Sequence, residues 1–160
     1  MDRKIYFICI HCSATSQKAR VETIVKNWKK MGWKNPGYHY IYKANGEEVQ
    51  LLADKEIANG VKGHNQNAIH MAYIGGVNPE TGKAKDTRTK EQKEAMLKRL
   101  KLLAKLYPNA KVCGHRDFSP DLNGNGYIEP HEYIKQCPSF DVGRWLSSYK
   151  LGEELANMLK

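Results

Sequence analysis

The sequence lacks a long apolar run, a secretory leader and a dense set of cysteines. No apolar stretch in its 160 residues reaches the roughly 20 needed to span a membrane, so no membrane insertion is expected. The amino terminus, MDRKIYFICI, has only a short apolar run and no small-residue cleavage site. We therefore expect synthesis in the cytoplasm without a signal peptide. Four cysteines in this setting favour free thiols or a metal ligand, and Cys9 and Cys113 are expected to be small buried residues.

Acidic residues are also few, because 17 Asp and Glu oppose 26 Lys and Arg, which gives a net charge of +9. This excess suggests an anionic partner, and both nucleic acid and a cell-wall polymer have that charge. No aromatic residues that could stack on bases are interleaved with the lysines of the expected helix (Lys90, Lys93, Lys98, Lys101 and Lys105). No nucleic-acid partner is therefore expected.

The order of the expected elements indicates a single α/β domain over residues 1–160. Runs of β-branched and aromatic residues predict strands at 4–11, 68–76 and 110–115. Residues 38–52 contain Asn45-Gly46, whose preference for positive φ predicts a tight hairpin. Because strands and helices interleave, we expect a mixed central β-sheet with helices on its faces.

Apolar residues at helical spacing predict three helices. The first ends at Gly32 and presents Val21, Ile24, Val25, Trp28 and Met31. The second begins with a Thr89–Gln92 capping box, ends at Pro108 and presents Met96, Leu97, Leu100, Leu103 and Tyr107. The third lies near the carboxyl terminus and presents Val142, Trp145, Leu146 and Tyr149.

Three residues in polar loops could bind a metal. His11 and His115 each follow a predicted buried strand, and Cys137 precedes Pro138 and the last helix. Two histidines and a cysteine suit zinc, and three protein ligands with one open position are typical of a catalytic site. A histidine at a strand end is also commonly a hydrogen-bonded core residue, and His131 is an alternative ligand by chemistry. Spacing alone leaves these readings open.

Five motifs in order resemble those of a known enzyme family. They are IHCSAT at 10–15, GWKNPGYHYIY at 32–42, KGHNQNAI at 62–69, GHRD at 114–117 and KQCPSFDVGRW at 135–145. The chain is similar in these motifs to the zinc-dependent N-acetylmuramoyl-L-alanine amidases of the phage-lysozyme and peptidoglycan-recognition type, the amidase type 2 family.

The resemblance implies that zinc is held by His11, His115 and Cys137, and that Tyr38 and Lys135 act in catalysis. Zinc lowers the pKa of bound water to about 7, which would allow attack on an amide carbonyl. An ammonium at Lys135 would stabilise the oxyanion, and Tyr38 would position the water or move its proton. Without the resemblance, Tyr38 would be an ordinary strand aromatic and Lys135 a surface lysine.

Four further polar residues lie near these motifs. His64 and Asn67 match a loop that lines the substrate groove in relatives, so the resemblance implies that they bind substrate. His39 is expected to face away from Tyr38 if the strand alternates. His70 stands where relatives usually carry a small residue, and the sequence leaves its role open.

Residues 121–132, DLNGNGYIEPHE, match a calcium-binding loop. The expected ligands are Asp121, Asn123, Asn125, the Tyr127 carbonyl, Glu129 and Glu132. An Asn- and Gly-rich turn is the alternative, but a turn needs neither Gly126 at position six nor Glu132 at position twelve. As an insertion before the third zinc ligand, the loop is expected to be a structural clamp on the segment bearing Lys135 and Cys137.

The sequence thus predicts a monomeric zinc amidase that cleaves the amide bond between N-acetylmuramic acid and L-alanine in bacterial peptidoglycan. The expected role is that of a phage or prophage endolysin that acts on the cell wall after release. The alternative is a non-catalytic peptidoglycan-binding or regulatory protein of the same fold, because relatives that lose the cysteine ligand only bind.

Overall fold

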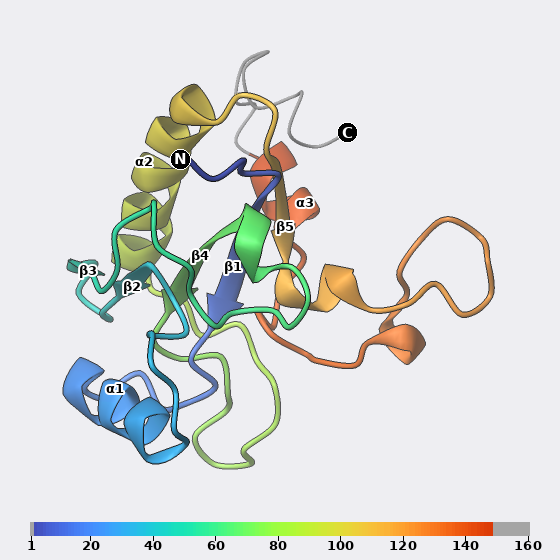
Figure 1. Ribbon diagram of the computed structural model, residues 1–160. Helices are drawn as coiled ribbons and strands as arrows, with labels where there is room; N and C mark the ends of the chain where they lie inside the picture. The colour runs from blue at the N-terminus through green and yellow to red at the C-terminus, as the bar shows by residue number, and fades with distance from the viewer. Residues whose placement is uncertain (1, 149–160) are drawn as a thin grey trace.

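The computed structural model describes residues 2–148, which build a five-stranded sheet in the order β3-β2-β4-β1-β5 (Figure 1). β1, β2, β4 and β5 pair in parallel, and β3 pairs antiparallel with β2. The strands are β1 (Phe7–Cys12), β2 (Tyr40–Tyr42), β3 (Glu48–Gln50), β4 (Ala68–Tyr73) and β5 (Lys111–Gly114). The predicted α/β fold with a mixed sheet is confirmed.

Helices cover both faces of the sheet. The helices are α1 (Val21–Lys30), α2 (Lys90–Leu106) and α3 (Val142–Ser147). Short 3₁₀ turns occupy Asn65–Asn67, His115–Phe118 and Pro130–Glu132. α2 and α3 share the largest apolar cluster with β1, β4 and β5, whereas α1 packs on the other face against β2 and β4. The central strands are therefore buried on both faces, as is typical of parallel sheets.

The alternation of β1 decides which face receives the polar side chains. Ile8 and Ile10 belong to the cluster under α2 and α3, while Cys9 packs with Val61 on the opposite face. Because successive side chains point to opposite faces, His11 shares the face of Cys9. The end of β1 therefore places a buried histidine on the face without α2, close to the loops that follow β4 and β5.

The capping box of α2 forms as predicted. The Thr89 hydroxyl accepts a hydrogen bond from the Gln92 amide, and the Gln92 side chain accepts one from the Thr89 amide. The Gln92 side-chain amide is buried and donates to the carbonyls of Tyr42 and Ile74. One residue thus both starts the helix and ties it to the ends of β2 and β4.

Two details at the ends of elements differ from the prediction. β2 and β3 form the predicted antiparallel hairpin, but its connection is not tight: it spans residues 43–47, and Gly46 has a φ of 87° whereas Asn45 is not left-handed. The Asn45 side chain instead accepts a hydrogen bond from the Glu47 amide, which stabilises a longer turn. Met31 is 63% exposed because α1 ends at Lys30, one residue before it. The expected contact of Tyr149 lies outside the described residues.

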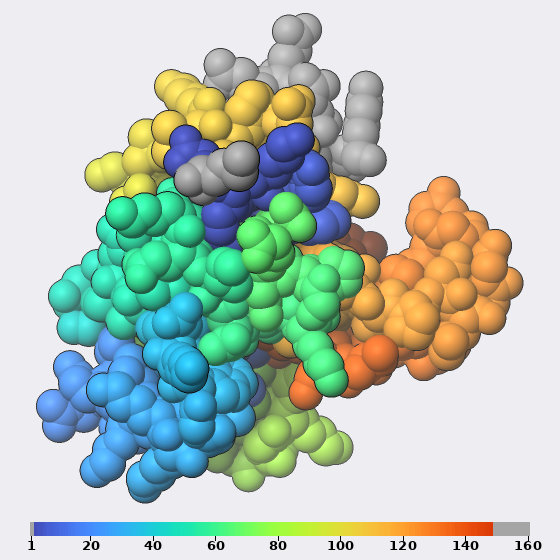
Figure 2. Space-filling view, viewed as in Figure 1, coloured from blue at the N-terminus to red at the C-terminus, as the bar shows by residue number. Residues whose placement is uncertain are grey.

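The insertion at 121–132 stands out from the body of the molecule as an arm (Figure 2). It follows the 3₁₀ turn after β5 and returns through Pro130–Glu132 toward Cys137. Within residues 2–148, no helix has both the length and the apolar character needed to cross a membrane.

Candidate metal centre

His11 and His115 meet because their strands are neighbours. β1 and β5 pair in parallel with Ile10 opposite Gly114, so the residues that follow emerge at the same edge of the sheet. His11 is the fifth residue of β1, and His115 begins the 3₁₀ turn after β5. Their ring centroids lie 4.9 Å apart at 72°. Two imidazoles that follow predicted strands are thus brought together, as expected.

Cys137 lies on a loop that is bonded to the turn containing His115 and packs against the end of β5. Its carbonyl accepts a hydrogen bond from the Arg116 amide at 2.8 Å, which ties the loop to the turn containing His115. A side chain at Gly114 would collide with Pro138, so glycine at that position lets the loop pack against the end of β5. The Cys12 amide donates to the Cys137 sulfur at 3.3 Å. This contact directs the sulfur toward the histidines and favours its anionic form.

The spacing of the three side chains fits zinc. The Cys137 Sγ lies 3.7 Å from Nδ1 of His11. All three candidate ligand atoms lie within 4.8 Å of one another. Tetrahedral zinc, with Zn–N of about 2.0 Å and Zn–S of about 2.3 Å, separates nitrogen and sulfur by roughly 3.6 Å. The group needs little rearrangement to surround one ion. His131, the alternative ligand, groups instead with Glu129 and Glu132 in the insertion.

Burial prepares the histidines to act as ligands. It lowers the pKa of His11 well below its usual value, and the nearby His70 and His115 lower it further. Burial and the charge of Lys135 also lower the pKa of His115. Both rings are therefore neutral near pH 7 and can each offer a lone pair. A hydrogen bond with the Cys12 side chain, together with burial, raises the pKa of Cys137, and the bond from the Cys12 amide only partly offsets this. A bound cation would displace that proton.

Tyr38 lies directly beside the three candidate ligands. Its ring centroid is 5.0 Å from that of His11, and it packs edge-on against Trp28 at 5.2 Å. Its hydroxyl donates to the Cys12 carbonyl at 3.2 Å. Burial raises the pKa of Tyr38 well above its usual value, so the hydroxyl keeps its proton. The prediction that His39 faces away from Tyr38 was wrong, because the His39 ring stacks on His70, which itself contacts His11. β2 begins only at Tyr40, so the strand alternation does not extend to Tyr38.

An open groove of about 330 Å³ runs beside His115. Lys135, His64 and Lys62 line it together with the apolar side chains of Val61, Phe118 and Ile134. A larger hollow of about 400 Å³ lies between β5 and the insertion, but none of the three candidate ligands lines it. Of these two hollows, the groove beside His115 is the one that a candidate ligand lines.

His64 and Asn67 occupy different settings despite their closeness in sequence. His64 is exposed at the groove, with its ring 4.5 Å from that of Phe118. The Asn67 side chain donates to the Lys4 carbonyl at 2.8 Å and does not line the groove. The structure therefore brings His64 to the site and gives Asn67 a hydrogen bond elsewhere.

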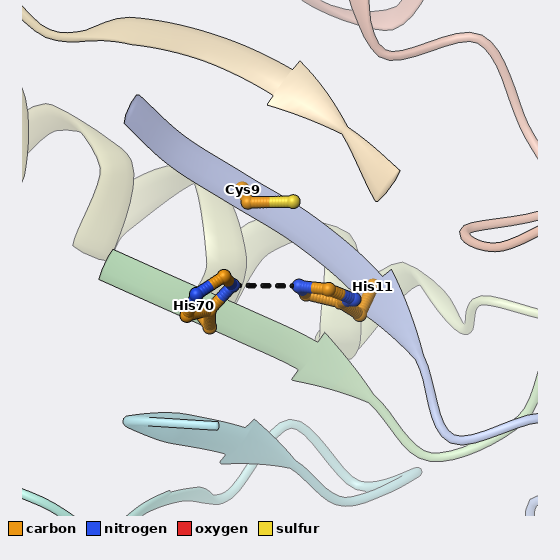
Figure 3. Close-up of side chains that lie close together, drawn as sticks. All are labelled: Cys9, His11 and His70. Carbon is orange, nitrogen blue, oxygen red and sulfur yellow. Dashed lines mark hydrogen bonds between the residues drawn. The ribbon is translucent and has the colours of Figure 1, made fainter. Parts of the chain in front are cut away.

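Sequence reasoning did not assign His70, which contacts a candidate ligand. His70 is fully buried in β4, and its Nδ1 lies 2.8 Å from Nε2 of His11 (Figure 3). The pairing of β1 with β4 sets Cys9 opposite His70, which brings residues far apart in the chain together. The alternation of β4 could have placed His70 on the side of Ala72, but only the register of two strands identifies its partner.

The insertion is organised around its own oxygen atoms. The Asp121 carboxylate accepts hydrogen bonds from the Gly124 and Gly126 amides, and Gly126 has a φ of 86°. Amides of residues 122, 123 and 129 donate to the Glu132 carboxylate, which is only 3% exposed. The side-chain oxygens of Asn123 and Asn125 accept from the amides two residues later. The loop is therefore closed on itself, with both terminal carboxylates turned inward.

Comparison with known proteins gives a consistent result. The family described as N-acetylmuramoyl-L-alanine amidase matches residues 1–139. The endolysin of Escherichia phage T7 is 31% identical over 146 residues, which cover 90% of this chain and 87% of that protein. An uncharacterized protein of Haemophilus influenzae is 45% identical over 103 residues, which cover 64% of this chain and 84% of that protein.

Solved structures share the fold. The amidase LysC from Clostridium intestinale superposes with a TM-score of 0.71 at 16% identity, covering 94% of this chain and 88% of that one. The endolysin of the Thermus scotoductus bacteriophage Ph2119 gives a TM-score of 0.67 at 22% identity, covering 100% and 88% of the two chains.

Proposed function

The chain belongs to the N-acetylmuramoyl-L-alanine amidase family and is a peptidoglycan amidase, and on that premise we propose that it is a zinc-dependent endolysin. The bond cleaved would be the amide between N-acetylmuramic acid and the L-alanine of the stem peptide. The observation that carries this proposal is the convergence of His11, His115 and Cys137, whose ligand atoms lie within 4.8 Å of one another.

The three side chains would hold zinc and leave one position open to the groove. The neutral rings of His11 and His115 each provide a nitrogen lone pair, and Cys137 provides a sulfur supported by the Cys12 amide. Zinc at this site would act as a Lewis acid that lowers the pKa of water to about 7 and polarises the scissile carbonyl. Three protein ligands are the arrangement of catalytic rather than structural zinc.

Lys135 and Tyr38 would serve the reacting amide from two sides. Lys135 lines the groove next to His115, where its ammonium would stabilise the negative charge that develops on the amide oxygen. The protonated hydroxyl of Tyr38 lies beside His11, where it would orient water or pass a proton to the leaving amine. Both residues act on charge or protons, and neither is needed as a metal ligand.

The groove would bind the stem peptide. His64 offers an exposed ring, and the lysines at positions 62 and 135 suit a substrate that carries carboxylates. Asn67 as a substrate contact stays a prediction, because its side chain is already bonded to the Lys4 carbonyl. The partner is bacterial peptidoglycan, and the protein would work on it as a monomer.

We also propose that the insertion binds calcium through Asp121, Asn123, Asn125, the Tyr127 carbonyl, Glu129 and Glu132. Its support is the inward-facing carboxylates of Asp121 and Glu132 and the left-handed Gly126. In this state the Glu129 carboxylate accepts from the side chains of Asn123 and Asn125, so calcium would replace those bonds. The bound ion would fix the segment that leads to Lys135 and Cys137.

A purely peptidoglycan-binding protein of the same fold is the competing function. It would need no third ligand, whereas Cys137 is present with its sulfur 3.7 Å from His11. The test is incubation with purified peptidoglycan followed by mass analysis of the soluble products. Stem peptides with a free L-alanine amino terminus support the amidase. Binding to the polymer without release of such peptides supports the binding protein.

A further inference from the structure

His70 is the buried residue in direct contact with a proposed zinc ligand. Its Nδ1 faces Nε2 of His11 (Figure 3) at a distance of 2.8 Å, and its side chain is fully buried. Its other ring nitrogen, Nε2, has no hydrogen-bond partner within residues 2–148. Burying a polar atom without a hydrogen-bond partner costs folding free energy, so packing alone does not account for a histidine at this position.

The two nitrogens of His11 face different neighbours. Nδ1 faces the Cys137 sulfur at 3.7 Å, and Nε2 faces His70. A neutral imidazole carries one proton, so a lone pair at Nδ1 requires the proton to be at Nε2. That proton can then be donated only to Nδ1 of His70, which must accept it. His70 would then carry its own proton on Nε2, the nitrogen that has no hydrogen-bond partner within residues 2–148.

We propose that His70 is a positioning residue that holds His11 in the tautomer and orientation needed to bind zinc through Nδ1. The inference rests on the proposed zinc-dependent function. Partners that accept the second N–H of a ligating histidine fix its ring and raise its basicity, and losing one typically costs about 10- to 100-fold in metal affinity. The opposite tautomer would place a proton on Nδ1 of His11, between its ring and Cys137, and would block binding.

The surroundings of His70 fix its ring. The His70 amide donates to Nδ1 of His39 at 3.0 Å, which leaves the His39 proton on Nε2 for the Glu56 carbonyl at 3.0 Å. The His39 ring stacks on the His70 ring at 13° with centroids 5.9 Å apart. On another side, a Cβ at Gly60 would collide with the His70 ring, so glycine permits the close approach. The acceptor is therefore rigidly presented to His11.

A second metal ion among Cys9, His11 and His70 is the competing explanation for this cluster, because their candidate ligand atoms also lie within 4.8 Å of one another. Two nitrogens on a tetrahedral zinc stand roughly 3.3 Å apart, given Zn–N distances of about 2.0 Å. The separation of 2.8 Å is that of a hydrogen bond. The geometry therefore favours a proton between the two rings.

The test compares His70→Asn with His70→Leu. The two side chains have nearly the same size and shape, and the asparagine oxygen can occupy the place of the histidine Nδ1, whereas leucine accepts nothing. Zinc affinity is measured by competition with a chromogenic chelator. We expect His70→Leu to lose about 10- to 100-fold in affinity and His70→Asn to retain most of it. Equal losses in the two variants would reduce His70 to a packing residue and overturn the proposal.

A spectroscopic measurement reads the tautomer directly. Long-range ¹H–¹⁵N correlation spectra of the histidine-labelled parent distinguish the protonated from the unprotonated ring nitrogen. We expect His11 to be protonated at Nε2 both before and after zinc is added. Protonation at Nδ1 in the zinc-free protein, or a metal-induced shift at Nε2, would contradict the proposal even if neither variant folds.

The control is Gln92→Leu, which removes a buried polar side chain that bonds two carbonyls at the α2 side of the sheet. It should lower the melting temperature while leaving zinc affinity at the parental value. A comparable loss of zinc affinity in this control would mean that general destabilisation explains the His70 effect. If the parent itself binds no zinc, the proposed function fails, whereas a zinc-binding parent with indistinguishable Asn and Leu variants rejects the role of His70 alone.

Discussion

The metal centre and the insertion are built in opposite ways. The candidate ligands of the metal centre come from three distant segments, around His11, His115 and Cys137. The pairing of β1 with β5 brings the two histidines together, and the hydrogen bond from the Arg116 amide holds the loop of Cys137 beside them. The insertion draws its candidate ligands from twelve consecutive residues, most of them exposed on an arm (Figure 2). Its shape comes from hydrogen bonds within the loop itself.

The two sites differ in which contacts hold their candidate ligands in place. The sheet and the loop contact at Cys137 hold the three candidate ligands in place, so little ordering would oppose the binding of an ion. The insertion is anchored mainly by its own backbone, so an ion there would have to replace bonds such as those from Asn123 and Asn125 to Glu129. Changes in the first site should therefore abolish function, whereas changes in the second should alter only stability.

The largest effect is expected from Cys137→Ala. Two remaining histidines seldom hold a catalytic metal, so this variant should lose bound zinc and show no detectable hydrolysis. Metal content is read by mass spectrometry and hydrolysis by release of stem peptides. Cys113→Ala, which truncates another cysteine in the buried cluster with Cys9, is the matched control and should keep both. A full equivalent of zinc and parental hydrolysis in Cys137→Ala would remove the sulfur from the site.

Lys135→Ala should separate catalysis from metal binding within the first region. Loss of one group that stabilises an oxyanion typically costs about 100-fold or more in rate, while zinc content should stay at one equivalent. Lys101→Ala, an exposed lysine on α2, serves as the control. If the two variants hydrolyse peptidoglycan at the same rate, Lys135 is only a surface lysine.

The insertion should respond to calcium through stability alone. With zinc held constant, millimolar calcium is expected to raise Tm by several degrees, because an ion that binds only the folded state stabilises it. Glu132→Gln removes a carboxylate that accepts three backbone hydrogen bonds and should weaken this response, whereas Glu80→Gln in another exposed loop should not. A calcium shift that is absent from the parent, or equal in all three proteins, would leave the twelve residues as a turn.

The smallest effects concern the rim of the groove. His64→Ala should raise KM with little change in kcat, since its ring lines the surface beside His115. Asn67→Ala should leave both constants unchanged and cost about 1 kcal/mol of stability through its lost hydrogen bond to the Lys4 carbonyl. Steady-state kinetics measure KM and kcat, and thermal melts measure stability. A raised KM in Asn67→Ala would show that Asn67 contacts the substrate.

The contrast also explains which features could be predicted from the sequence. The strand before His11, the capping box of Thr89 and Gln92 and the twelve-residue insertion are local patterns, and the sequence carries them in full. The meeting of His11 with His115 depended on strand order, which the resemblance to a family implied and residue spacing did not. The contact of His70 with His11 required the register of β1 and β4, which no local pattern specifies.

The errors have the same physical origin. Asn45-Gly46 favours left-handed angles at both positions, but the longer connection between β2 and β3 needed only one of them. Met31 follows the apolar spacing of α1, yet the helix ends before it and leaves it in solvent. In both places the end of an element, rather than its interior, escaped prediction.

The hydrogen bond from the Arg116 amide to the Cys137 carbonyl joins the segments on either side of the insertion, so the insertion begins and ends at nearly the same place. The chain leaves the body of the molecule next to His115 and returns next to Cys137, two proposed zinc ligands that lie close together. The number of residues in the insertion can therefore change without moving its two ends apart. Lengthening such a loop costs little, since each doubling adds only about 0.6 kcal/mol of closure entropy. We therefore expect that loops of other lengths can replace the insertion, in evolution or by engineering, while the candidate metal centre keeps its geometry.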